Sequence, residues 1–120
     1  MALKVYLYEK CGTCRKAKQW LDKEEIPYEA IPIVEQPPGK EELRRMWQQS
    51  GLDLKKFFNT SGQLYRELNL KERLPQMSEE EMLTLLAENG KLIKRPLITD
   101  GSRVTVGFQE AEMEQWRSKR

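Results

Sequence analysis

The feature that most constrains the fold of this chain is a strand, helix and strand pattern completed within about the first 35 residues. Residues 3–8 alternate with period two and are rich in β-branched and aromatic side chains, which favours a strand with both faces largely covered. From residue 13 apolar side chains recur at helical spacing, and Pro27 predicts that this helix ends near Glu25. Residues 28–34 return to a strand pattern, so the order favours an α/β fold.

The middle of the chain, from about residue 40 to residue 90, is expected to form a helical block. An apolar stripe at helical spacing ends at Gly51, which suits a helix C-cap. Residues 54–70 predict short, irregular helices. Ser78 and Glu81 have the spacing of a capping box and therefore predict the start of another helix.

The last part of the chain predicts a hairpin and a closing helix. Residues 97–99 and 103–106 have the pattern of two short strands around the turn sequence Asp100-Gly101, and an apolar stripe ending at Trp116 follows. We therefore expect an α/β fold with a mixed sheet of about four strands. The 120 residues suit one domain spanning residues 1–120.

Composition excludes several classes of function. The chain has no histidine, which removes histidine-dependent catalysis and metal sites with histidine ligands. The chain has 21 lysines and arginines and 19 acidic residues, and the basic residues are spread along its length. We therefore expect no nucleic-acid-binding face. The longest apolar run, residues 5–8, cannot span a membrane, and no export signal is evident. We therefore expect a cytoplasmic monomer with no metal and no bound cofactor.

Cys11 and Cys14 are the only cysteines, and they form a Cys-Gly-Thr-Cys motif between the first strand and the first helical turn. Backbone N–H groups at a helix start lack partners and the helix dipole is positive there, so a thiolate is stabilised. Cys11 is expected to be the more exposed, attacking thiol. Cys14 falls on the apolar stripe, one turn later, where it can resolve a mixed disulfide on Cys11. The motif predicts thiol-disulfide chemistry.

Other interpretations of the cysteine pair remain open. It could be half of a zinc site, although the chain has neither a second cysteine pair nor a histidine. It could be a structural disulfide, which is unusual in a cytoplasmic protein with an adequate core. It could also be two unrelated buried cysteines. A scaffold with a vestigial site would carry two unperturbed, slowly reacting thiols.

Four motifs in order resemble those of the ArsC/Spx family of arsenate reductases and their relatives. They are CGTCRKA at residues 11–17, EQPP at 35–38 with EEL at 41–43, LIKRPL at 92–97, and VGF at 106–108. The resemblance covers essentially the whole chain, and the ordered set is far more specific than the cysteine pair alone. It implies a thioredoxin-like fold with a helical insert at about residues 40–90.

In the arsenate reductases of this family, a cysteine at the Cys11 position attacks arsenate, three arginines hold the oxyanion, and glutathione with glutaredoxin completes the reduction. Arg95 matches one arginine, and its planar fork suits an oxyanion or a carboxylate. Asn59 and Val106 stand at the other two positions. Each lost charge-assisted bond weakens oxyanion binding by about 1.5 to 3 kcal/mol, which disfavours efficient arsenate reduction. Glutathione with glutaredoxin, or thioredoxin, is the expected electron donor.

Cys14 is a second departure, since the arsenate reductases commonly carry serine there. It places the chain closer to the Spx-like branch, whose members hold a Cys-x-x-Cys redox switch and bind the α subunit of bacterial RNA polymerase. Gly51 aligns with a glycine that matters for this contact, although helix capping explains it without a partner. Spx proteins also carry a longer C-terminal segment than a chain ending at Arg120, which counts against the regulator.

Four more residues complete the expected site. By resemblance, Pro96 is the cis proline that faces the active cysteine; on sequence alone it merely opens a strand. Gly12 and Thr13 are expected to contact a bound anion, although the Thr13 hydroxyl also suits helix capping. Arg95 is either a site residue or a plain surface cation.

The leading hypothesis is a cytoplasmic thiol-disulfide oxidoreductase of the ArsC/Spx type, with some arsenate reduction as a subsidiary activity. Cys11 attacks, Cys14 resolves, and Arg95 steers an anionic substrate or glutathione. The alternative is a redox-switched transcriptional regulator that binds the RNA polymerase α subunit. A pull-down of that subunit dependent on Gly51 and on oxidation would favour the alternative.

Overall fold

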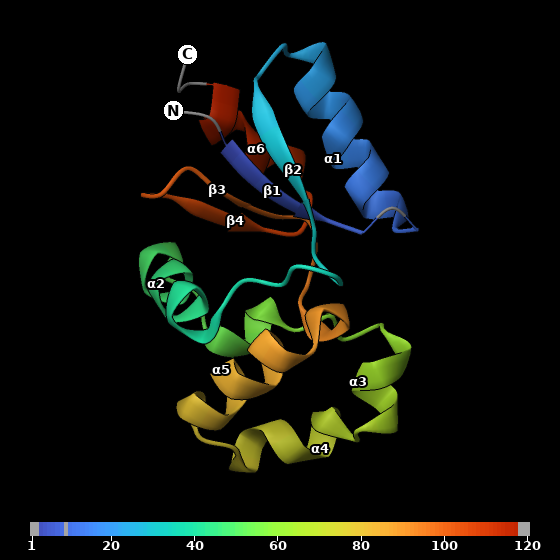
Figure 1. Cartoon of the computed structure of the whole chain (residues 1–120), viewed down its shortest axis with the longest axis vertical. Helices are drawn as coiled ribbons and strands as arrows, with labels where there is room; N and C mark the ends of the chain where they lie inside the picture. Colours follow the sequence, from blue (N-terminus) through green and yellow to red (C-terminus); the bar gives the residue numbers. More distant parts are fainter. Residues whose placement is uncertain (1–2, 9, 118–120) are drawn as a thin grey trace.

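The computed structural model describes residues 3–8 and 10–117, and its centre is a four-stranded mixed sheet (Figure 1). The strands lie in the order β2-β1-β3-β4, with β1 parallel to β2 and the other pairs antiparallel. Their bounds are β1 (Leu3–Leu7), β2 (Tyr28–Pro32), β3 (Leu97–Thr99) and β4 (Val104–Val106). The predicted fold class is therefore confirmed.

Helices account for most of the remaining chain. The α-helices are α1 (Gly12–Lys23), α2 (Lys40–Ser50), α3 (Gln63–Glu67), α4 (Leu70–Arg73), α5 (Glu79–Glu88) and α6 (Glu110–Arg117). The short 3-10 helices are η1 (Leu54–Phe57), η2 (Leu74–Gln76) and η3 (Gly90–Leu92). In the part of the chain that the structure describes, no helix is both long and apolar enough to cross a membrane.

The first two strands end earlier than the sequence pattern predicts. At the end of β1, the N–H of Tyr8 donates to the sulfur of Cys14 at 3.4 Å instead of continuing the sheet ladder. At the end of β2, the carbonyl of Pro32 accepts a bond from the N–H of Gln36 and closes a turn. Both strands therefore stop beside the cysteine motif.

The two faces of the sheet are covered by different layers. Helices α1 and α6 cover one face, where Val5, Leu21 and Trp116 share one buried apolar cluster. The helical block from α2 to η3 covers the other face, where Tyr6 and Leu97 join the larger cluster (Figure 1). Alternate residues of β1 thus serve both layers, which explains the largely covered strand expected there.

Local signals in the helical block behave as expected. Ser78 and Glu81 form the reciprocal capping box of α5. Gly51 ends α2 in the left-handed conformation, with φ of 71°, so helix capping accounts for this glycine. Glu80 bridges α5 to α2 through Arg44 and Lys40. The Glu80 contacts hold α5 against α2 within the block.

Candidate active site

The cysteine motif lies where β1 turns into α1. The N–H of Cys11 donates to the Tyr8 carbonyl at 2.9 Å, and Cys11 is the N-cap residue of α1 with extended backbone angles. Cys14 lies in the first turn of α1. It is 2% exposed, whereas Cys11 is half-buried, and both are free thiols. The predicted difference in exposure between the two sulfurs is present.

The pKa of Cys11 is lowered. Burial opposes ionisation and is the largest single influence, but hydrogen bonds from the backbone N–H and thiol of Cys14, together with a hydrogen bond and positive charge from Arg95, outweigh it. The backbone contribution is the helix-start effect expected from the sequence. The contribution of Arg95 comes from a residue distant in the chain, which tertiary structure brings next to Cys11.

The pKa of Cys14 moves in the opposite direction, to about 12. Burial of the thiol is the main cause, and the neighbouring Cys11 adds to it, while the N–H of Tyr8 and the charge of Arg95 act against the shift. One turn of helix therefore holds a thiol whose pKa is lowered beside one whose pKa is raised. This asymmetry gives the two sulfurs different chemical roles.

Arg95 is held in place before the cis peptide bond to Pro96. Its guanidinium lies over the ring of Tyr8, 4.8 Å from the ring centroid, and its Nη1 donates to the Lys91 carbonyl at 3.1 Å. The prediction of a cis Pro96 is confirmed. Arg95 is half-buried and contributes a hydrogen bond and a positive charge at Cys11.

Cys11 opens into a cavity of about 410 Å³. The cavity is lined by residues from both halves of the fold: Cys11, Thr13, Asn59, Ser61, Gly62, Lys94, Arg95, Val106, Gly107, Phe108 and Gln109. All three positions assigned to oxyanion-binding arginines, now Arg95, Asn59 and Val106, therefore meet around Cys11. Lys94 adds a second cation to this wall.

Asn59 reaches the cavity because backbone hydrogen bonds join its part of the helical insert to the segment before β3. The N–H of Asn59 donates to the Leu92 carbonyl, and the N–H of Lys94 donates to the Phe57 carbonyl, both at 2.7 Å. Gly62 leaves room for the Asn59 side chain, because a Cβ on Gly62 would lie 2.7 Å from the side-chain amide nitrogen of Asn59. The insert is thus part of the site.

Residues 6–116 match the model of the ArsC family, nearly the whole chain. The chain belongs to the ArsC family. A crystal structure from Bacteroides fragilis, described as related to the ArsC family, is 48% identical with a TM-score of 0.94, and covers 97% of this chain and 98% of its own. An arsenate reductase from Vibrio cholerae is 29% identical with a TM-score of 0.84, covering 96% and 97%.

Curated relatives of this ArsC family chain include regulators. The protein YusI of Bacillus subtilis is 63% identical over 115 residues, 96% of this chain and 98% of YusI. The global transcriptional regulator Spx of Enterococcus faecalis is 32% identical over 111 residues, 92% of this chain and 83% of Spx. The family therefore contains proteins named as reductases and proteins named as regulators at similar distances from this chain.

Other residues proposed from the sequence lie outside the Cys11 cavity of this family member. Gly12 is the exposed first residue of α1, and a Cβ there would meet nothing within 4 Å. Pro96 is buried, and its carbonyl accepts a bond from the N–H of Gly107, which lines the cavity. Gly51 caps α2 and is absent from the cavity lining.

Sequence reasoning missed two contributors to the site. Tyr8 supports Arg95 through its ring and Cys14 through its backbone N–H. Lys94 passes over Gly107, whose φ of 82° and missing Cβ allow this approach. The sequence shows an aromatic residue three positions before Cys11 and a basic neighbour of Arg95, but only the fold shows that Tyr8 contacts Cys14 and that Lys94 lines the Cys11 cavity. Among residues 3–8 and 10–117, no group of three or more acidic or cysteine side chains could hold a metal ion.

Proposed function

We propose that this ArsC family protein is a thiol-disulfide oxidoreductase acting as a single domain and a monomer in the cytoplasm. The observation that carries the proposal is that half-buried Cys11 opens into a cavity beside Arg95 within one helical turn of buried Cys14; the pKa of Cys11 is lowered and that of Cys14 is raised. A thiolate is the reactive form of cysteine in thiol exchange. Cys11 is therefore the attacking group and Cys14 the resolving group.

The reaction proceeds in two exchanges. The Cys11 thiolate attacks a substrate disulfide, forms a mixed disulfide, and releases one substrate thiolate. The Cys14 thiol then gives up its proton to the departing sulfur and attacks Cys11, forming the Cys11–Cys14 disulfide and releasing the second substrate thiol. The substrate has gained two electrons and the enzyme has lost two. Glutathione with glutaredoxin, or thioredoxin, returns the two electrons.

The high pKa of Cys14 suits the resolving role. A protonated, buried Cys14 does not compete for the substrate, and it becomes a nucleophile only when a mixed disulfide places a sulfur leaving group next to it. Arg95 stabilises the Cys11 thiolate whenever Cys11 is the leaving group or the free nucleophile. With Thr13, it also contacts the substrate in the cavity of about 410 Å³.

Arsenate reduction is a subsidiary activity in this proposal. The cavity keeps Arg95 and adds Lys94, which gives an oxyanion two cationic partners. Asn59 and Val106 supply no charge at the other two positions. Affinity for arsenate is therefore expected to be low, and disulfides are the favoured substrates.

A redox-switched regulator that binds the RNA polymerase α subunit is the second candidate. The similarity to proteins named Spx and the regulatory protein MgsR favours it. Gly51, at the exposed end of α2, would then contribute to the contact. If a pull-down captures no RNA polymerase α subunit with either the reduced or the oxidised protein, this candidate is excluded.

Serine substitution of each cysteine tests the oxidoreductase proposal. The Cys11→Ser variant is expected to lose turnover of an aromatic disulfide. The Cys14→Ser variant is expected to accumulate a mixed disulfide on Cys11, detected by intact mass. Wild-type turnover in Cys11→Ser, or absence of a trapped adduct in Cys14→Ser, would contradict the mechanism.

A further inference from the structure

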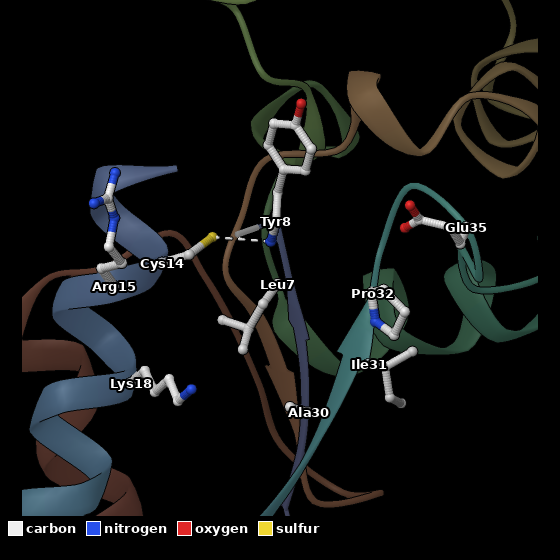
Figure 2. Close-up of a pocket in the computed structure, with 9 residues that line it drawn as sticks. All are labelled: Leu7, Tyr8, Cys14, Arg15, Lys18, Ala30, Ile31, Pro32 and Glu35. Carbon is white, nitrogen blue, oxygen red and sulfur yellow. Dashed lines mark hydrogen bonds between the residues drawn. The ribbon is translucent and has the colours of Figure 1, made fainter. Parts of the chain in front are cut away.

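A second cavity, of about 530 Å³, opens on the side of the motif away from the Cys11 cavity. Figure 2 shows it as a groove between α1 and β2, with Leu7 of β1 between its two walls and Cys14 at one end. Cys14 and Tyr8 belong to this lining, whereas Cys11 and Arg95 line the other cavity. The thiol pair thus separates two cavities.

The β2 wall of the groove is the edge of the sheet. Strand β2 is the outermost strand and pairs only with β1 among the described residues. Ala30 and Pro32 are exposed and Ile31 is half-buried, so this wall offers an apolar surface beside an open strand edge. An extended chain can pair its backbone with such an edge, and every second side chain then faces the α1 side of the sheet. Pro32 lacks an N–H, which limits indefinite strand pairing here.

The α1 wall of the groove is positively charged. Arg15 and Lys18 are exposed, lie one turn apart, and line the groove, and within residues 3–8 and 10–117 neither forms an ion pair. The acidic Glu35 lies on the opposite side, beyond Pro32 (Figure 2). Charge complementarity therefore favours acidic side chains that face α1.

We propose that this groove docks an extended, acidic peptide segment of a partner protein, with the partner's acidic side chains against Arg15 and Lys18 and its apolar side chains against Ala30 and Pro32. The assignment rests on the proposed oxidoreductase function, and it adds the partner class and the surface. A partner docked here lies beside Cys14, and its disulfide still meets the attacking Cys11, which lines the other cavity.

A thiol-free peptide tests docking without any redox reaction. The probe is an acetylated ten-residue peptide that contains three glutamates and no cysteine. It is titrated into the reduced protein while the NMR signals of the backbone amides are followed. Signals of Lys18, Ala30 and Ile31 are expected to shift with saturation. A peptide with glutamine for glutamate is expected to bind about tenfold more weakly, because it lacks the charged pairs.

Charge reversal on α1 supplies the matched comparison. The Arg15→Glu/Lys18→Glu variant is expected to weaken binding of the acidic peptide about twentyfold. The Lys16→Glu/Lys23→Glu variant changes net charge equally at exposed α1 positions outside the groove lining, and should bind as the wild type does. A well-dispersed amide spectrum verifies that each variant is folded.

Three results would overturn the docking assignment: shifts confined to the Cys11 cavity, equal affinity for the glutamate and glutamine peptides, or equal weakening in both charge-reversal variants. If the wild-type protein binds the acidic peptide but does not turn over a disulfide, this result would instead count against the oxidoreductase function. The two proposals therefore fail in different experiments.

Discussion

Two substitutions at the Cys11 cavity should convert it toward a stronger oxyanion site. Asn59 and Val106 line this cavity with Arg95, and both are half-buried, so an arginine at either position can direct its guanidinium inward. The Asn59→Arg/Val106→Arg variant places two more fork-shaped donors around the point where Cys11 would meet a tetrahedral anion.

The expected gain in anion affinity depends on how exposed the new arginines are and on the charges around them. A charge-assisted hydrogen bond contributes about 1.5 to 3 kcal/mol, which solvent reduces to about 1 kcal/mol for half-buried partners. Two such bonds give about 2 kcal/mol, and repulsion from Lys94 and Arg95 removes roughly 0.5 kcal/mol. The net gain of about 1.5 kcal/mol corresponds to about tenfold tighter binding of arsenate or phosphate.

Protection of Cys11 from iodoacetamide measures this affinity. Phosphate is titrated at fixed ionic strength, and the half-protecting concentration gives the dissociation constant for each variant. Gln19→Arg/Gln48→Arg, at exposed positions outside the cavity lining, adds the same net charge and should leave the constant unchanged. Unchanged affinity in the Asn59→Arg/Val106→Arg variant, or equal tightening in both, would refute the reasoning.

Alkylation of Cys11 against pH should give a midpoint below the ordinary cysteine value, since its pKa is lowered, and Arg95→Gln should move that midpoint upward; an unmoved midpoint would exclude Arg95 as a cause. Cys14 should resist alkylation until strongly alkaline pH in the folded protein, as peptide mapping can verify, because burial raises its pKa to about 12. Gly90→Ala should lower stability by about 3 kcal/mol in urea unfolding, since its Cβ would lie 2.1 Å from a backbone oxygen of the β2–α2 connection. Gly39→Ala, which meets nothing within 4 Å, should cost much less, and equal losses would contradict the steric explanation.

Much of the fold was predictable because local signals and tertiary structure agree. The capping box of Ser78 and Glu81, the C-cap at Gly51 and the alternation in β1 each depend on a few neighbouring residues. Strand ends were less predictable. Strand β1 ends where the N–H of Tyr8 donates to the sulfur of Cys14, and β2 ends where the carbonyl of Pro32 accepts a bond from Gln36. The alternation of apolar residues does not encode either contact.

The hairpin turn shows the same limit on a smaller scale. Asp100-Gly101 marked the turn, yet the strands are separated by four residues, because the buried Asp100 carboxylate accepts bonds from the N–H groups of Ser102 and Arg103. A two-residue signal located the turn but not its length. Side-chain acceptors inside a turn decide how far it extends.

The sequence by itself determined the reactive elements of this protein: two cysteines one helical turn apart, no histidine, and a helix start that favours a thiolate. Those properties follow from covalent spacing and backbone dipoles. Only the tertiary structure brought Arg95 over Tyr8 beside Cys11, placed Asn59 in the same cavity, and opened a charged groove on the Cys14 side. Burial, approach of distant charges and cavity shape are properties of packing, and they set the pKa of each thiol and the partners it can meet.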